Sequence, residues 1–148
     1  MGDDGMAPLT ETLHSTIVSV DGRAVLIFGA SGTGKSALAL QLMTLGAVLV
    51  ADDRSIIMRD GSILLASAPT TIAGQIEARG IGILTVPFEP SAQVVLAVDM
   101  GRPTDSRMPE AETIDVLGQP VRCLRRVDGP HFAAAVLLSL RGGINLPA

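Results

Sequence analysis

The strongest constraint on how this chain folds is a glycine-rich segment, GASGTGKS, at residues 29–36. A fully apolar run, 24–28, precedes the segment, and a run of strong helix formers, 35–45, follows it. These patterns predict a buried strand, a tight loop and a helix in that order. A second apolar run at 47–51 completes a strand–loop–helix–strand order, which predicts a parallel βαβ unit with a right-handed crossover.

The segment matches G-x-x-x-x-G-K-[ST] in full, the pattern of the phosphate-binding P-loop. Its N–H groups and the positive end of the helix would hold the β- and γ-phosphates of a nucleotide. Lys35 would contact the phosphate oxygens, and Ser36 would ligate Mg²⁺. Lys35 is the only lysine among 11 basic residues, which an ordinary glycine-containing loop does not explain. The sequence therefore predicts a phosphotransferase that binds ATP and Mg²⁺ through Gly29, Ala30, Ser31, Gly32, Thr33, Gly34, Lys35 and Ser36.

Composition argues against several other classes of protein. Apolar residues make up 47% of the chain, with three Phe and no Trp or Tyr, so the core must be aliphatic, as in a buried sheet covered by helices. The lack of aromatic residues, the net charge of −4 and the pI near 5.0 argue against a nucleic-acid partner. No apolar run reaches about 18 residues, so no membrane span is expected. The N-terminus lacks a secretory signal pattern, and the single cysteine, Cys123, rules out an intrachain disulfide, so a cytoplasmic location is expected.

The length of 148 residues predicts a single α/β domain over residues 1–148. Residues 1–12 are polar and are expected to be flexible, and a polar loop is expected at 100–112. The other predicted elements are strands at 13–20, 55–59, 62–66, 81–86, 93–99, 113–117 and 120–127, and helices at 70–78 and 131–141.

Two places along the chain could supply the acids that a P-loop enzyme needs for the metal and the nucleophile. Asp52 and Asp53 directly follow the predicted strand 47–51, and ligands bind at the carboxyl ends of strands in open α/β sheets. Adjacent carboxylates repel each other unless a cation or a proton lies between them, so this pair favours a functional role over a solvated turn. Asp99, at the end of strand 93–99, is the competing candidate, and an ordinary turn residue is an equal alternative for it.

Four segments occur together and in order: Leu13-His14, the P-loop, GAVLVADD at 46–53 and EARGIG at 77–82. Asp52 follows Ser36 by 16 residues. In this combination the chain resembles the catalytic domain of HPr kinase/phosphorylase, closely over 13–86 and loosely over 87–141. The resemblance implies a P-loop-containing mixed sheet with flanking helices, related to phosphoenolpyruvate carboxykinase. It also implies a kinase that phosphorylates a serine of the phosphocarrier protein HPr with ATP and Mg²⁺.

The resemblance further assigns roles to individual residues. Asp53 would accept the serine proton, with Asp52 beside it and His14 close to both. Glu77 would join the P-loop serine at the magnesium ion, and Arg107 is the candidate for the catalytic arginine. Taken alone, His14 would be an ordinary strand residue, Glu77 a surface acid and Arg107 a loop cation.

Several features depart from the longer members of this family. The chain begins just before the catalytic domain, so a short form without the N-terminal domain is expected. Ala37 replaces the glutamate that typically follows the P-loop serine. The stretch 126–131 lacks most of the basic residues tied to the phosphorylase reaction, which argues against that reverse reaction. The longer enzymes are hexamers, and the apolar closing helix, 131–141, also predicts a homo-oligomer.

Three hypotheses for the function remain open from the sequence. The first is a serine kinase that acts on HPr. The second is a kinase for a small metabolite, although the chain lacks the Arg- or Lys-rich lid that most such enzymes close over the phosphates. The third is a nucleotide-binding regulator without transfer chemistry, which only the missing basic residues near the C-terminus support.

Overall fold

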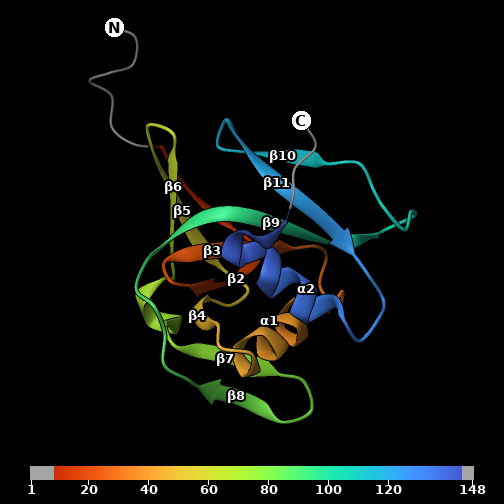
Figure 1. The fold of residues 1–148 in the computed structure, drawn as a ribbon. Helices are drawn as coiled ribbons and strands as arrows, with labels where there is room; N and C mark the ends of the chain where they lie inside the picture. The colour runs from red at the N-terminus through yellow and green to blue at the C-terminus, as the bar shows by residue number, and fades with distance from the viewer. Residues whose placement is uncertain (1–8, 145–148) are drawn as a thin grey trace, which may run out of the picture.

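The computed structural model describes residues 9–144 of the chain. Within these residues, nine strands form one mixed sheet, two more form a separate hairpin, and two α-helices pack together on one side of the large sheet (Figure 1). This arrangement confirms the predicted α/β class with a mixed sheet and flanking helices. No helix in the described range is long and apolar enough to cross a membrane.

The elements follow the chain in an order close to the predicted one. The strands are β1 (Leu9–Leu13), β2 (Ser15–Val20), β3 (Arg23–Phe28), β4 (Val48–Ala51), β5 (Ser55–Asp60), β6 (Ile63–Ser67), β7 (Gln75–Ala78), β8 (Gly82–Thr85), β9 (Ala92–Pro103), β10 (Glu112–Val116) and β11 (Gln119–Arg126). The helical segments are α1 (Lys35–Thr44), the 3₁₀ turn η1 (Thr70–Ile72), α2 (Phe132–Leu138) and η2 (Ser139–Gly143), a π-helical continuation of α2. The predicted helix at 131–141 is therefore present, with a change of helix type near its end.

The strand order along the large sheet is β1-β5-β6-β9-β3-β2-β4. β3 runs parallel to β9 on one side and antiparallel to β2 on the other, and β2 is in turn antiparallel to β4. β3 and β4 therefore point in the same direction, as the predicted βαβ unit requires, but they are not neighbours. The intervening strand β2 places its own side chains between the ends of β3 and β4.

β9 is the strand that joins the three parts of the sheet. It pairs with β3 along one edge, and on the other edge it pairs with β6 near its start and with β11 in its second half. Pairing with β11 keeps the strand extended as far as Pro103. The loop expected at 100–112 is therefore wrong for its first residues, because a polar, glycine-containing sequence stays extended when a neighbouring strand takes its backbone hydrogen bonds.

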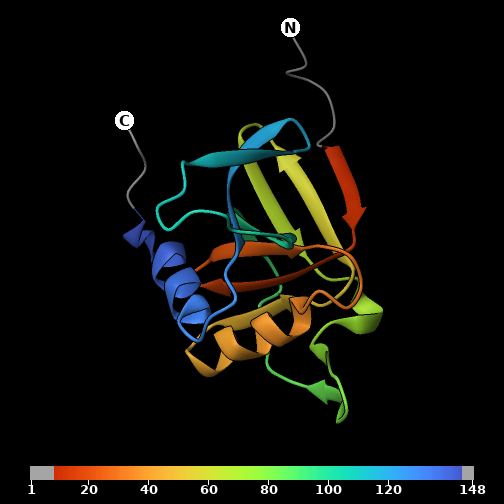
Figure 2. The same ribbon diagram turned by 90° about the vertical axis from the view of Figure 1, so that its right-hand side faces the viewer.

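Two apolar cores lie on opposite faces of the central strands. On one face, α1 and α2 pack against β2 and β3, with Ile27, Leu42 and Val136 fully buried. On the other face, Ile17 and Leu26 pack against side chains of β5, β6, β10 and β11, which rise on the side of the sheet away from the helices (Figure 2). Burial on both faces explains why the central strands are almost wholly apolar.

The helix expected at 70–78 is wrong, because the chain forms the turn η1 and then the strand β7. Gly74, between these two elements, has a φ of +75°, which interrupts any helix. Exposed and buried side chains then alternate along β7, with Ile76 fully buried, and this alternation is the period of a strand. Glu77 therefore lies on a strand that packs beside α1, and β7 and β8 form a hairpin outside the main sheet (Figure 1).

The structure describes only part of the segment 1–12, for which the sequence predicts flexibility. Residues 1–8 lie outside the described residues, whereas 9–12 belong to β1, which pairs antiparallel with β5. The side chains of β1 are mostly exposed, so backbone hydrogen bonds rather than burial hold the strand in place. Its sequence has no apolar alternation that could have predicted it. His14 separates β1 from β2, so the strand predicted at 13–20 is interrupted there.

Leu42→Ala is expected to lower the free energy of unfolding by about 2–5 kcal/mol, because truncation of a fully buried leucine leaves a cavity. Leu45→Ala is the control, since Leu45 lies just beyond the end of α1 and is 44% exposed. Its effect should stay within about 0.5 kcal/mol. Urea unfolding followed by circular dichroism measures both variants. Equal losses would contradict the packing of α1 described above.

Candidate functional site

The P-loop connects the end of β3 to the start of α1. Gly34 takes the N-cap position of α1 with a φ of +98°, and no side chain caps the helix. The first N–H groups of an α-helix have no partner within the helix, so those of α1 are available to an anion. Lys35 folds back over the loop, where Nζ donates to the carbonyl oxygens of Gly29 and Ala30 at 2.8 and 3.2 Å. The loop therefore combines free N–H donors with the only ammonium group of a lysine in the chain.

Met100 and Gly101 of β9 form the floor of the P-loop. A Cβ atom added to Gly29 would lie 3.2 Å from the backbone N of Gly101 and 3.3 Å from Cβ of Met100. A Cβ atom added to Gly34 would lie 3.5 Å from Cε of Met100. Gly29 also has a φ of +145°, a backbone conformation that favours glycine. The first glycine of the loop is thus required both by its own backbone and by the strand beneath it.

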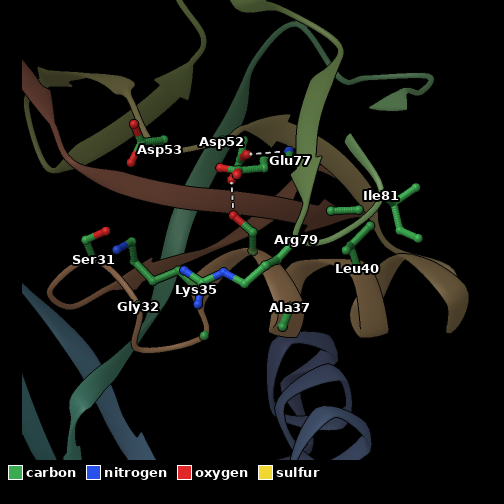
Figure 3. A pocket seen from close by; sticks show the side chains of 13 residues that line it. Ser31, Gly32, Lys35, Ala37, Leu40, Asp52, Asp53, Glu77, Arg79 and Ile81 are labelled. Atoms are coloured by element: carbon green, nitrogen blue, oxygen red, sulfur yellow. Dashed lines mark hydrogen bonds between the residues drawn. The ribbon is translucent and has the colours of Figure 1, made fainter. Parts of the chain in front are cut away.

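Asp52 links the end of β4 to the P-loop. It is buried, and its Oδ1 accepts hydrogen bonds from Ser36 Oγ at 2.7 Å and from Thr16 Oγ1 at 2.9 Å. Its Oδ2 accepts the backbone N–H of Glu77 at 3.0 Å (Figure 3). Because donors reach both oxygens, the carboxylate is fixed against the P-loop serine.

Asp53 has a different environment from its neighbour. It is exposed, and its φ of +67° places it in the left-handed region that few residues other than glycine adopt. Its N–H donates to Thr16 Oγ1 at 3.3 Å. The turn at this residue separates the two carboxylates, so that Asp52 stays on the P-loop serine and Asp53 remains accessible to solvent.

A hollow with a volume of about 580 Å³ lies over the loop and brings these groups together. Figure 3 shows its lining from close by. The polar side chains of the lining are Ser31, Lys35, Ser36, Asp52, Asp53, Glu77 and Arg79, and the apolar ones are Ala37, Ala78, Leu40 and Ile81. The P-loop, the acid pair and the EARGIG segment, which lie far apart in the sequence, therefore line one hollow.

His14 and Arg107 do not line this hollow. His14 is exposed between β1 and β2 and lines a second hollow, together with Phe28 of β3 and Asp115 of the β10–β11 hairpin. Arg107 is exposed in the segment between β9 and β10. Neither side chain belongs to the lining of the P-loop hollow, and their catalytic roles stay predictions.

Asp99 is held by groups other than those of the P-loop hollow. Its carboxylate accepts Arg102 Nε at 2.7 Å and the N–H of Gly101 at 2.9 Å. Arg102 also pairs with Glu112, which accepts Arg125 Nε at 2.7 Å. The hydrogen bond from Arg125 lowers the pKa of Glu112. Asp99 therefore belongs to a charged network on β9, β10 and β11, and the acid pair after β4 is the better candidate for the chemistry.

Two residues of the site were missed by the sequence analysis. Arg79 lines the hollow, and its signal was available, because it belongs to the EARGIG segment. Thr16 is fully buried at the acid pair, but in the sequence it is one polar residue in a mostly apolar strand. Its importance follows from the position of β2 between β3 and β4, which no local pattern shows.

The oxygen atoms of the site fit a magnesium ion that arrives with a nucleotide. Among the described residues, no group of three or more His, Cys, Asp or Glu side chains could hold a metal ion. Ser36 and Asp52 are nevertheless in contact, and Glu77 lines the same hollow. Magnesium is typically held by one or two carboxylates together with phosphate oxygens and water. The donors present match that partial set.

Comparison with known proteins points to one family. The model of the HPr serine kinase C-terminal domain matches residues 5–97. The HPr kinase/phosphorylase of Clostridium acetobutylicum is 34% identical over 148 aligned positions, which cover 92% of this chain and 48% of that protein. The HPr kinase/phosphorylase of Alkaliphilus metalliredigens is 48% identical over 85 positions, which cover 57% of this chain and 27% of that protein. The chain thus spans about half the length, or less, of these curated relatives.

A solved structure extends the similarity from sequence to fold. The structure of the HPr(Ser) kinase/phosphatase from Coxiella burnetii matches with a TM-score of 0.77 at 26% sequence identity, and the match covers 89% of each chain. The mixed sheet with few helices is therefore the fold of that protein as well.

Gly29→Ala is expected to destabilise the protein more than Gly61→Ala. Both glycines have positive φ, but a Cβ atom at residue 29 would lie 2.8 Å from Thr33 Oγ1 as well as against β9, whereas residue 61 has open space. Overpacking adds about 1–3 kcal/mol to the cost of the backbone conformation. Urea unfolding measures the difference between the two variants, and equal losses would contradict the close contact between the loop and β9.

Proposed function

The chain belongs to the HPr serine kinase C-terminal domain family, and we propose that it is an ATP- and Mg²⁺-dependent protein-serine kinase whose acceptor is the phosphocarrier protein HPr. The contact of 2.7 Å between Ser36 of the P-loop and Asp52, in a hollow that Asp53 also lines, carries this proposal. A phosphate-binding loop beside a carboxylate pair supplies both requirements of transfer from ATP to a hydroxyl group. The names of the relatives support HPr as the acceptor.

Nucleotide binding would rest on the P-loop and the first turn of α1. The uncapped N–H groups of this turn and the helix dipole favour the triphosphate at this position. Lys35 now donates to the carbonyl oxygens of Gly29 and Ala30 and would exchange these acceptors for phosphate oxygens. Its charge would then offset the charge that develops as the terminal phosphate is transferred.

Magnesium would be held by Ser36, with Asp52 and Glu77 as the carboxylates in reach of the same hollow. When bound, the ion neutralises charge on the phosphate oxygens. The sequence analysis paired Ser36 with Glu77 alone. The direct contact between Ser36 and Asp52 supports adding Asp52 to this set, so that its first role is at the metal rather than at the acceptor.

Asp53 is the proposed base for the acceptor serine. Both oxygens of Asp52 accept hydrogen bonds from the protein, whereas no donor within the described residues contacts the exposed carboxylate of Asp53. Asp53 would take the proton of the serine hydroxyl while the serine oxygen forms its bond to the γ-phosphorus. The bond from that phosphorus to the bridging oxygen breaks in the same transfer, and ADP leaves.

Arg79 is the proposed source of additional positive charge at the transferred group. It lines the hollow, as Figure 3 shows, together with Lys35 and the acid pair. Arg107, which the sequence analysis chose by position, lies on an exposed segment outside the hollow. A guanidinium group beside the P-loop can spread charge over the phosphate oxygens, and a distant one cannot.

The weakening of the reverse reaction stays a prediction from the sequence, and the structure shows how the one arginine of the stretch 126–131 is engaged. Arg126, at the start of the stretch that lacks basic residues, donates to the carbonyl oxygen of Met100 at 2.8 Å and pairs with Asp128 at 2.9 Å. This guanidinium therefore supports the floor of the P-loop. The hexameric assembly and the cytoplasmic location remain predictions from the sequence, and the names of the relatives favour a protein acceptor over a small metabolite.

Labelled ATP is expected to transfer phosphate to a serine of purified HPr, and Asp53→Asn should lower the rate about 10²–10⁴-fold because the base is lost. Asp60→Asn is the control, since Asp60 is an exposed acid at the end of β5. Mass spectrometry identifies the modified residue. An undiminished rate in Asp53→Asn would contradict the assigned base. A folded wild type that binds ATP without labelling HPr would contradict the acceptor.

Arg79→Ala is expected to lower the transfer rate about 10²–10³-fold, the usual loss when one charge-stabilising donor is removed. Arg107→Ala is the matched variant, because it removes the same side chain from an exposed position outside the hollow. Steady-state kinetics with saturating ATP measure both. A large loss in Arg107→Ala together with a small one in Arg79→Ala would restore the original assignment.

A further inference from the structure

We infer that Thr16 is a positioning residue, whose single hydroxyl group orients both members of the acid pair. Thr16 is fully buried on β2. Its Oγ1 donates to Asp52 Oδ1 at 2.9 Å and accepts the N–H of Asp53 at 3.3 Å. The role rests on the proposed function, since it concerns the same hollow, and it falls on a residue outside every motif of the sequence.

The order of the strands explains how one side chain reaches this place. β2 separates β3, which leads into the P-loop, from β4, which leads into the acid pair. Thr16 pairs with Ile27 near the end of β3, and its neighbour Ile17 pairs with Ala51, the last residue of β4. Thr16 therefore lies between the two strand ends that form the site. A side chain there can contact the residues that follow β4 and hold them beside the loop.

As a donor, the Thr16 hydroxyl group orients the carboxylate of Asp52. Its Oδ1 accepts hydrogen bonds from Thr16 and Ser36 together, and Oδ2 accepts the N–H of Glu77. Without Thr16, Oδ1 would keep only the hydrogen bond from Ser36, the residue that is also the expected magnesium ligand. The Asp52 carboxylate would then no longer be held in a fixed orientation relative to Ser36. Residues that hydrogen-bond to metal ligands typically contribute 10–100-fold to metal affinity or activity.

As an acceptor, the Thr16 hydroxyl group orients the backbone of Asp53. The ladder between β2 and β4 shifts register near its end, between Ile17 and Val18, and the next backbone segment has no strand partner. The N–H of Asp53 finds its acceptor in Thr16 instead, while the backbone holds a φ of +67°. A strained conformation persists only where its surroundings fix it. The hydroxyl thus fixes the turn that leaves the Asp53 carboxylate open to the hollow.

Three variants separate the hydroxyl from the shape of the side chain. Thr16→Val keeps the branched shape and the strand preference but removes donor and acceptor. Thr16→Ser keeps the hydroxyl and removes the methyl group. Ser19→Ala is the control, because Ser19 is a buried hydroxyl residue on the same strand, on the opposite face of the sheet from Thr16.

In phosphate transfer to HPr, Thr16→Val is expected to lower kcat about 10–100-fold, with the KM for ATP within about twofold of wild type. We expect kcat to fall while the KM for ATP stays nearly unchanged, because Thr16 contacts the acid pair and not the phosphate-binding backbone. Thr16→Ser should recover most of the rate, and Ser19→Ala should match wild type. A role in packing alone would be met by valine, so an active Thr16→Val or an equally inactive Thr16→Ser would overturn the inference.

Binding of a fluorescent ATP analogue, with and without Mg²⁺, gives a readout that does not depend on the acceptor. Affinity without Mg²⁺ is expected to be equal in all the proteins, whereas the gain on adding Mg²⁺ should be about tenfold smaller in Thr16→Val and restored in Thr16→Ser. An equal gain in every variant would overturn the inference. If wild-type protein fails to label HPr, the proposed acceptor is wrong, and this measurement still decides the role of Thr16. Thr16→Ala, which needs no added space, provides the same comparison if Thr16→Val does not fold.

Discussion

The site depends on the hydrogen bond between Ser36 of the P-loop and Asp52. This contact joins the segment after β3 to the segment after β4, although β2 lies between the two strands. A buried carboxylate is stable only when donors replace its water, and Thr16 and the backbone of Glu77 supply the remaining ones. β7 lies beside α1 and carries the N–H of Glu77 that Asp52 accepts, and the left-handed turn at Asp53 separates the two carboxylates.

Sequence analysis recovers the parts of the site that short stretches of chain determine. The P-loop was predicted with its flanking strand and helix because eight consecutive residues carry its geometry, and the acid pair because it directly follows an apolar strand. The predicted helix at 70–78 failed because Gly74 and the burial of Ile76 against α1 outweighed local preference. Thr16 could not be predicted at all, since its role arises from the order of strands in the sheet.

The residue roles that the family resemblance implied fall into two groups, according to whether the residue lines the P-loop hollow. The P-loop, Asp52, Asp53 and Glu77 meet at one hollow, as the resemblance implied. His14 and Arg107 do not line that hollow: the first lines a second hollow beside the β10–β11 hairpin, and the second lies on an exposed segment. Arg107 lies in the exposed segment between β9 and β10, whereas Arg79 follows β7, which packs on α1 through Ile76. Position in a motif predicts placement best where the motif belongs to a packed element.

The location of β9 also sets the order in which the molecule can form. The P-loop is complete in sequence at Ser36, yet its floor is Met100 and Gly101, and its supporting strand β3 pairs with 93–99 of β9. Contacts between segments so distant in the chain form slowly, after the local ones. A nascent chain that ends before β9 would carry the whole P-loop sequence without the surface that shapes it. Nucleotide binding should therefore appear late in synthesis, when the middle of the sheet closes.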